Sequence, residues 1–352
     1  MRANALKSFP FLADMYKIKQ VNADFRVLED LKPDFGDNGT YSYYLLEKEG
    51  VSTGEAISRL ARHFGIEKKK FGYAGNKDKR AQTQQVISIQ GIIQKQPVEL
   101  GNLSLKYLGR GHERINLGDN SGNNFEIVVR NLDANAIHNK ISFIPNYFDT
   151  QRFSTANFQI GISIIQKKWN DALSLLTATK QLQKHDVDTM HGHSDPIRQI
   201  RTLDKRLLMI FVHSVQSKIF NELLCSCIKS GKGKYREFID NGMEFCFPEN
   251  KSSEQELPLV GFGTEINEES LMHKLNELLS KYGIRQRDFI IRELPGLSSE
   301  GHLRKAFVDV QNLTISDLED DDLNTGKKKC TVSFSLPKGS YATIVIKSMF
   351  GQ

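Results

Sequence analysis

The chain of 352 residues exceeds the size at which a single hydrophobic core usually stops growing, so two domains are expected. With 39% hydrophobic and 26% charged residues it has the composition of an ordinary globular protein, and no apolar run approaches the about 18 residues that a membrane-spanning helix needs. The net charge of +6 is mild, but the positive residues cluster locally, which favours a polyanionic partner such as nucleic acid.

The N-terminus and the cysteines predict a cytoplasmic protein without structural disulfides. The N-terminal residues MRANALKSFPFLADMYK lack the apolar core and cleavage signature of a secretion signal. Among Cys225, Cys227, Cys246 and Cys330, only the first two are close in sequence, and no nearby histidines complete a zinc pattern. We therefore expect four reduced packing residues and no metal site.

The first half of the chain reads mainly as strands. Alternation of apolar and polar residues predicts strands within residues 16–31, 40–47, 86–92 and 125–130, the first stretch being two short strands around a turn. Between them the period changes at residues 54–65, where the apolar residues fall on one helical face and Gly65 ends the helix.

From about residue 157 helical spacing takes over. It predicts helices at residues 158–176, at 203–229, and in a segment that Asn267 caps and Gly283 ends. After residue 300 strand patterns return at residues 306–310, 330–336 and 342–350, and we expect the last to complete a sheet begun near the N-terminus. The acidic run at residues 317–322 is expected to be a solvated loop and not a metal site.

This arrangement predicts an α+β fold with a discontinuous domain. Strands at both ends of the chain suggest one domain built from residues 1–170 and 300–352. A helix-rich α+β insertion is expected at residues 171–299.

Residues 71–85, with the sequence FGYAGNKDKRAQTQQ, combine one carboxylate with several cations. Asp78 stands between Lys77 and Lys79, Arg80 follows, and three lysines precede the stretch at residues 68–70. Glycine and asparagine tolerate left-handed backbone and aspartate caps turns, so the residues alone favour a solvated turn. The adjoining lysines make a phosphate-contacting edge a competing interpretation.

Five separated stretches resemble the TruD family of tRNA pseudouridine synthases. They are YAGNKDKRAQTQQ at 73–85, IKQVNADFRVLED at 18–30, LG followed by GN-x-F at 117–125, PNYF-x-x-QRF at 145–153, and LPKGSYATIVIK at 336–347. They stand in family order. Asp149 and Ser154 depart from the pattern, since the family often has glycine there. The match is weaker over 171–299, where the family carries its insertion, although HSVQSKIFNELL at 213–224 resembles the family's Ser-rich helix.

The resemblance implies a fold and a reaction. The fold is a pseudouridine synthase catalytic domain with a mixed, mainly antiparallel sheet flanked by helices, interrupted by a TRUD insertion domain. The reaction isomerises uridine to pseudouridine in RNA, most often uridine 13 of tRNA, and needs no cofactor. Asp78 falls on the family's catalytic aspartate, which acts either as a nucleophile at C1' or as the base that removes a C2' proton. Lys19 matches the family's basic residue and would offset the cost of desolvating that carboxylate.

The resemblance also implies a binding site for an extruded base. Phe148 aligns with an aromatic residue placed against the target base, where stacking is worth about 1 to 3 kcal/mol. Asn146 can offer a donor and an acceptor to the base edge or hold the catalytic loop. The cations expected to contact phosphate or fix the loop are Lys77, Lys79, Arg80 and Arg152. The implied partner is tRNA, with no membrane and no obligate protein partner.

Two other functions were weighed. Asn76, Lys77 and Asp78 superficially resemble the guanine-specificity motif of GTPases, but that motif needs a residue between the lysine and the aspartate, and the chain has no phosphate-loop sequence. A GTPase is therefore excluded. The alternative left open is a non-catalytic tRNA-binding protein or RNA chaperone, in which the same cations bind tRNA and Asp78 only caps a turn.

Overall fold

The computed structural model describes residues 16–91, 94–136, 138–179, 195–251 and 255–351. The chain divides into two compact units. The terminal unit combines residues up to 142 with residues 309–351, and the middle unit comprises residues 143–308. Compactness divides the chain at 142 and 309. The boundaries expected at 171 and 299 concern the family's insertion and stay a prediction.

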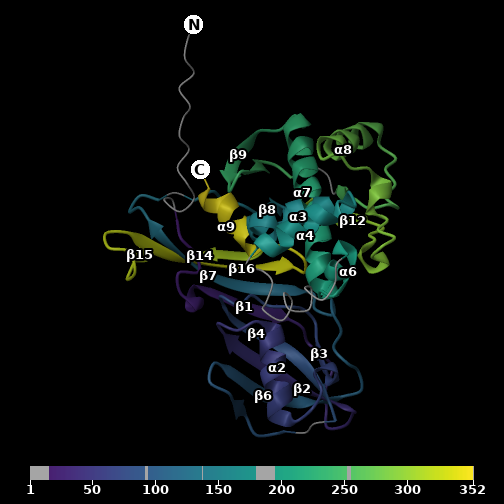
Figure 1. Ribbon diagram of the computed structural model, residues 1–352. Coiled ribbons are helices and arrows are strands. Elements are labelled where there is room, and N and C mark those ends of the chain that lie inside the picture. Colours follow the sequence, from purple (N-terminus) through teal and green to yellow (C-terminus); the bar gives the residue numbers. More distant parts are fainter. Residues whose placement is uncertain (1–15, 92–93, 137, 180–194, 252–254, 352) are drawn as a thin grey trace. The chain divides into compact units, whose positions relative to one another are not determined.

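The terminal unit is built on one large sheet (Figure 1). Its strands are Phe25–Asp30 (β1), Tyr41–Glu49 (β2), Phe71–Tyr73 (β3), Gln82–Gln90 (β4), Val98–Glu99 (β5), Leu103–Gly111 (β6), Gly122–Leu132 (β7), Gln311–Ile315 (β14), Glu319–Asp320 (β15) and Lys328–Pro337 (β16). The strand order is β14-β16-β7-β1-β4-β2-β6-β5, with β15 beside β16 and β3 beside β4. Only β1 and β4 pair in parallel among these strands, so the mixed, mainly antiparallel sheet is confirmed.

The helix expected at residues 54–65 is confirmed as Thr53–Phe64 (α2). Ser52 caps its N-terminus by accepting a hydrogen bond from the backbone of Glu55, and Gly65 follows with the left-handed φ of 64° that favours glycine. Its apolar face packs on the inward side chains of β2 and β4. The core that results includes Ala56, Ile57, Leu60, Leu46, Ile87 and Ile89.

The start of the chain differs from the expected pair of strands. Residues Asn22–Asp24 form a 3-10 turn (η1), and β1 follows as expected. The other expected strand is reduced to one bridge, in which the backbones of Lys17 and Arg130 exchange two hydrogen bonds of 2.8 Å. Pairing stops there because Lys19 adopts a positive φ of 57°, which is incompatible with an extended strand.

The last strand expected from the sequence is instead a helix, Ala342–Phe350 (α9). Its β-branched residues favour a strand by propensity, but α9 is buried almost throughout, so the period of its apolar residues gives no signal. The expected completion of the sheet by residues 342–350 is therefore wrong. The C-terminal strand that does join the sheet is β16, which pairs with β7.

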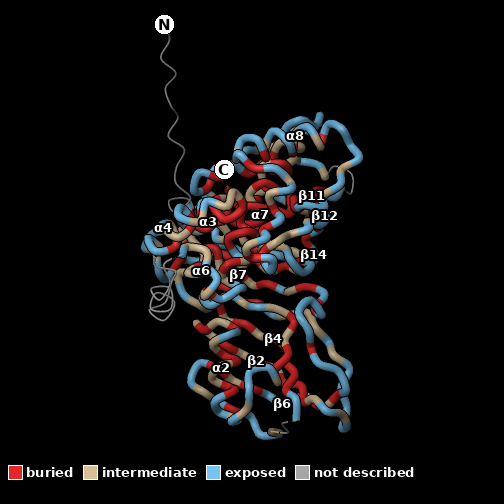
Figure 2. Tube along the Cα trace, turned by 45° about the vertical axis from the view of Figure 1, so that its right-hand side comes forward, coloured by how far each residue is buried: buried red, intermediate tan, exposed pale blue. Residues whose placement is uncertain are grey.

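The middle unit is rich in helices. They are Ser154–Ile165 (α3), Trp169–Ala178 (α4), Pro196–Arg201 (α6), Lys205–Ser230 (α7) and Glu269–Lys281 (α8), with 3-10 turns at Thr150–Arg152 (η3), Gln286–Phe289 (η4) and Pro295–Leu297 (η5). The single helix expected at 158–176 is two, broken at Lys167, whose φ is 58°. Glu268, and not Asn267, is the N-cap of α8. Figure 2 shows buried residues along α7, which is the core helix of the unit.

Short strands complete the middle unit. They pair as Tyr235–Asp240 (β9) with Met243–Pro248 (β10), Glu256–Leu259 (β11) with His302–Lys305 (β12), and Phe143–Pro145 (β8) with Phe307–Asp309 (β13).

The expectation of four reduced cysteines is wrong. Cys225 on α7 and Cys246 on β10 form a disulfide, while Cys227 and Cys330 are free. The sequence could not indicate this pair, because the packing of α7 against β10 brings the two residues together across 21 positions of sequence.

No helix in the described ranges is both long and apolar enough to cross a membrane.

Candidate active site

The loop between β3 and β4 carries Asp78, whose side chain is 43% exposed. The Nζ atom of Lys19 lies 2.6 Å from Asp78 Oδ2, and the Lys19 side chain is only 14% exposed. At this distance the ammonium makes a charge-assisted hydrogen bond that holds the carboxylate in one orientation. The structure therefore brings together the two residues that the sequence comparison made the catalytic pair.

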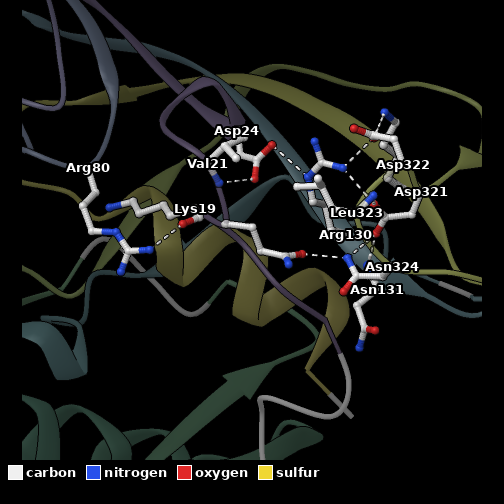
Figure 3. Close-up of polar contacts among 12 residues, drawn as sticks. Lys19, Val21, Asp24, Arg80, Arg130, Asn131, Asp321, Asp322, Leu323 and Asn324 are labelled. Atoms are coloured by element: carbon white, nitrogen blue, oxygen red, sulfur yellow. Dashed lines mark hydrogen bonds and ion pairs between the residues drawn. The ribbon is translucent and has the colours of Figure 1, made fainter.

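Two contacts fix Lys19 itself. Arg80 donates a hydrogen bond of 2.8 Å from Nη2 to the main-chain oxygen of Lys19 (Figure 3). The Lys19 ammonium also lies 3.9 Å from the centroid of the Phe25 ring, a cation–π contact. With its φ of 57°, Lys19 turns away from the path of a strand, and these contacts hold its side chain at Asp78.

The backbone of the Asp78 loop is held from the helix and strand beneath it. Thr53, at the start of α2, accepts a hydrogen bond from the backbone nitrogen of Lys77 at 2.9 Å. The Thr53 hydroxyl also donates to the side-chain oxygen of Gln85, whose amide in turn donates to Gly75 O. This chain of buried bonds fixes the loop just before Asp78, so the carboxylate does not depend on the loop's own propensity for its position.

Lys77 points into the protein and not toward solvent. Its Nζ pairs with Glu29 Oε1 at 2.5 Å, and the two side chains are 6% and 0% exposed. Burial raises the pKa of the Glu29 carboxyl, although Lys77 opposes the shift. Lys77 was expected either to contact phosphate or to fix the loop, and its buried ion pair with Glu29 favours the second role. Lys79, by contrast, is 65% exposed and lies 3.8 Å from Glu55.

A buried cation that the sequence analysis did not single out lies under the same loop. Lys48 of β2 is 3% exposed and donates to Val51 O at 2.7 Å and to the main-chain oxygen of Asp78 at 2.9 Å. Burial lowers the pKa of Lys48 to about 8, and the nearby Asp78 opposes the shift. A signal was present in the sequence, because Lys48 continues the inward-facing alternation of Tyr44 and Leu46.

A second network ties the segment that carries Lys19 to the hairpin of β15 and β16 (Figure 3). Arg130 is 6% exposed and bonds to Asp24, Asp321 and Asp322 at 2.8 to 2.9 Å. Asp24 caps the backbone of Val21, two residues after Lys19. The acidic run expected to be a solvated loop therefore includes a buried member, Asp321, which balances the charge of Arg130.

The expected base-binding residues lie in the middle unit. Phe148 is 8% exposed, and the side-chain amide of Asn221 on α7 brackets its backbone by accepting from Phe148 N and donating to Phe148 O. The Phe220 ring meets Phe148 edge to face at 5.7 Å. Tyr147 is completely buried.

Cations surround Phe148. The guanidinium carbon of Arg304 lies 4.2 Å from the Phe148 ring centroid, and that of Arg152 lies 6.0 Å away. Arg304 also donates to the main-chain and side-chain oxygens of Asn146, the latter at 2.6 Å. Burial, together with the positive charge of Arg152, lowers the pKa of His213 to about 4, so that imidazole stays neutral. Arg304 gave no signal in the sequence, because Asn146 is distant along the chain. Asn221 lies in the stretch at 213–224 that resembles a family helix, but nothing there indicates that it contacts Phe148.

Metal ligation has little support in the described part of the chain. The residues grouped closely enough to share an ion there are Cys225, Glu244 and Cys246. The two cysteines are joined in a disulfide and offer no thiolate. The sequence-predicted site residues instead fall into two sets: Asp78, Lys19, Lys77, Lys79 and Arg80 in the terminal unit, and Phe148, Asn146 and Arg152 in the middle unit.

The fold and these residues define a class of protein: an α+β protein whose mixed sheet carries a lysine-paired aspartate on a rigid loop. A sequence model of the family described as tRNA pseudouridine synthase D (TruD) matches residues 15–193 and 187–349. The chain belongs to the TruD family. It is therefore an isomerase of the pseudouridine synthase type.

Individual relatives resemble the chain over nearly its whole length. A "Probable tRNA pseudouridine synthase D" of Nanoarchaeum equitans is 31% identical over 90% of this chain and 89% of its own. The tRNA pseudouridine synthase D of Aquifex aeolicus is 26% identical over 95% and 98%. A crystal structure from Methanosarcina mazei with the TruD designation has a TM-score of 0.66 and 26% identity, covering 95% of this chain and 93% of that one.

Proposed function

We propose that this chain converts uridine to pseudouridine in tRNA, with uridine 13 as the target and Asp78 as the reacting carboxylate. The observation that carries the proposal is the contact of 2.6 Å between Lys19 and Asp78 on a loop fixed by partly buried hydrogen bonds. Family membership supports the reaction type, and the names of the relatives support tRNA as the substrate. A cytoplasmic location follows from that substrate and belongs to the same proposal.

The reaction needs an ionised carboxylate beside the ribose. In one route Asp78 attacks C1' and the uracil leaves through N1; C5 of the turned base then displaces the carboxylate. In the other, Asp78 takes a proton from C2' as the uracil leaves, and returns it after C5 has joined C1'. Both routes end with the C5 proton lost and N1 protonated, so no electrons or groups are imported. Lys19 supports both by holding the Asp78 carboxylate in one orientation.

The base-binding roles that the resemblance implies for Phe148, Asn146 and Arg152 belong to the same proposal. Phe148 is the aromatic residue proposed to stack on the base, and the Arg304 guanidinium lies 4.2 Å from the centroid of its ring. Arg304 holds both oxygens of Asn146, so this amide is positioned before the base arrives. Arg152 is suited to a phosphate near the ring.

In the terminal unit, the cations divide into two groups by the contacts that they make. Lys77 and Arg80 fix the loop through Glu29 and through Lys19 O, respectively. Phosphate contacts fall to exposed cations of the terminal unit, namely Lys68, Lys69 and Lys79.

Replacing Asp78 by asparagine tests the reaction. The amide keeps the size of the side chain but cannot act as nucleophile or base, so pseudouridine formation should fall by at least about 1,000-fold. The rate is followed as tritium released from tRNA transcripts labelled at C5 of uridine, and RNA affinity, measured by filter binding, should stay within about threefold of wild type.

The matched control is Asp37→Asn, which removes an exposed carboxylate far along the chain from the loop and should leave the rate unchanged. Mapping of pseudouridine in tRNAs from cells with and without the gene tests position 13. Undiminished modification by purified Asp78→Asn protein would overturn the proposed chemistry, and a different mapped position would overturn the target alone.

A further inference from the structure

Lys48 is a buried cation that follows apolar residues on the inward face of β2. Its neighbours along the inward face of β2, Tyr44 and Leu46, are apolar and 1% and 0% exposed. Burying an ammonium costs several kcal/mol unless it is well paired, so an aliphatic residue would stabilise this strand more. The described hydrogen bonds of Lys48 go to two main-chain oxygens, those of Val51 and Asp78.

One of these oxygens lies just before α2, and the other lies in the loop that carries Asp78. Val51 O precedes the N-terminus of α2, from which Thr53 holds Lys77 N. Asp78 O belongs to the reacting residue itself. One side chain thus joins β2, the start of α2 and Asp78 at 2.7 and 2.9 Å.

We propose that Lys48 is a positioning residue for pseudouridine formation: its buried ammonium fixes the peptide group of Asp78 and places a positive charge beneath the carboxylate. The inference rests on the proposed role of Asp78. Lys48 acts through Asp78, whereas Lys19 contacts the carboxylate directly at 2.6 Å. The two lysines therefore hold Asp78 from different sides of the residue, one at the side chain and one at the backbone.

The charges that face Lys48 determine how it titrates. Asp78 in the loop favours the charged ammonium, and Lys77 opposes it, with Glu29 of β1 already paired to Lys77. Across the sheet Lys48 faces Thr83 of β4 and Leu103 of β6, which do not ionise. Burial is the largest effect and lowers the pKa of Lys48 to about 8.

This titration separates positioning from stability. Between pH 8 and about 10.5 the folded Lys48 has lost its proton while the unfolded lysine keeps it, so its contribution to stability rises with pH. Activity should change in the opposite direction, because a neutral amine makes weaker hydrogen bonds to the two carbonyls and carries no charge for Asp78. A purely structural lysine would make activity follow stability instead.

The experiment compares wild type with Lys48→Met and Lys48→Arg at saturating enzyme between pH 6 and pH 9, using unmodified tRNA transcripts labelled with tritium at C5 of uridine. For Lys48→Met the single-turnover rate at pH 7 should fall about 100-fold while the Kd for tRNA changes less than about threefold. Wild type should lose rate as pH rises through about 8. Lys48→Arg should recover much of the rate and keep it at pH 9, since guanidinium stays protonated.

Two controls distinguish the possible failures. Ile89→Val removes a methylene from the same core on β4 and should lower the melting temperature without changing the rate or its pH profile. Asp78→Asn should be inactive. Wild-type rate and pH profile in Lys48→Met, with Asp78→Asn inactive, would overturn the role of Lys48 alone; activity in Asp78→Asn would overturn the proposed function and this role together. Should Lys48→Met fail to fold, an unchanged alkaline loss of rate in Lys48→Arg overturns the role.

Discussion

The ion pair between Lys19 and Asp78 joins residues 59 positions apart in the sequence. Lys19 reaches Asp78 because its positive φ ends the strand pairing of the N-terminal segment. Arg80 then donates a hydrogen bond to the main-chain oxygen of Lys19. Arg80 thus serves Asp78 indirectly, through the residue that contacts it. A partly exposed ion pair is worth little for stability, so we attribute this one to the orientation of the carboxylate.

Changing Lys19 should therefore affect the rate more than the fold. Lys19→Met is expected to lower the single-turnover rate about 100-fold or more, because the carboxylate loses its fixed cation, while the melting temperature changes little. Lys19→Arg should recover part of the loss, since arginine keeps both the charge and the contact with Phe25.

Tritium release and thermal melting measure the two effects. Lys32→Met, which removes an exposed lysine, is the matched control. A Lys19→Met protein with unaltered rate would contradict the role given to this pair.

Single residues could be foreseen from the sequence only where a local motif carried them. Asp78, Lys19 and Phe148 are candidate site residues because each stands in a motif with family spacing. Arg304 acts on a partner 158 positions away, and no local pattern marks it. Asn221 stands in the stretch at 213–224 that resembles a family helix, but its partner Phe148 lies 73 positions away. Lys77 was found but its burial was not, because Glu29 lies 48 positions before it.

At the scale of elements, the hairpin between β15 and β16 does more than close the sheet. Its buried Asp321 accepts from Arg130, from Asn131 N and from Leu323 N, while Asn324 bonds to Gln20. Burial would raise the pKa of Asp321, but these hydrogen bonds lower it to about 2. The hairpin thereby anchors the segment that carries Lys19.

Removal of the central cation should destabilise the terminal unit. Arg130→Met leaves the carboxylates of Asp24 and Asp321 buried without their partner, which costs about 3 to 5 kcal/mol of unfolding free energy. Urea denaturation measures the loss, and the triple change that adds Asp24→Asn and Asp321→Asn should recover part of it. A loss confined to below about 1 kcal/mol would show that the network is not buried in solution.

The same network predicts an acid limit to stability. The pKa of Asp321 is lowered in the folded state, so its stabilisation is fully present above the unfolded value of 3.8 and is lost as pH falls toward about 2. Acid unfolding followed by circular dichroism should therefore show a midpoint at higher pH for Asp321→Asn than for wild type. Equal midpoints would mean that other carboxylates set the limit.

Element types were predictable where one face is buried and one is exposed. The pattern of α2 gave its type and its end at Gly65 because its polar face meets water. The pattern failed at α9, which is buried almost throughout, and its Ile and Val residues then favoured the wrong structure. The acidic run was misjudged for a related reason, because the partner that draws Asp321 inside, Arg130, is 191 positions away.

On the scale of the whole molecule, the terminal unit is built from two separate parts of the chain that share one sheet. Strand β16 pairs with β7 along nearly its whole length, so the sheet needs both ends of the chain. The strand pattern at the two ends of the sequence predicts a discontinuous domain. It could not predict the cut points at 142 and 309, because no change of composition marks them.

The two units are therefore expected to differ in what they need in order to fold. Residues 143–308 contain their own core helix, α7, and the disulfide from Cys225 to Cys246, so this fragment should unfold cooperatively in urea when expressed alone. Residues 16–142 alone should not, since β7 lacks β16 and Arg130 lacks Asp321.

Joining residues 16–142 to residues 309–351 should restore the terminal unit. A short glycine-serine linker is enough, because Ser142 O accepts a hydrogen bond of 2.8 Å from Val310 N, which places the two cut ends side by side. The joined protein should show a cooperative transition, and adding Arg130→Met to it should abolish most of that stability. A cooperative transition in residues 16–142 alone would show that β16 is dispensable, whereas a joined protein without one would show that the terminal unit depends on residues 143–308 for its fold.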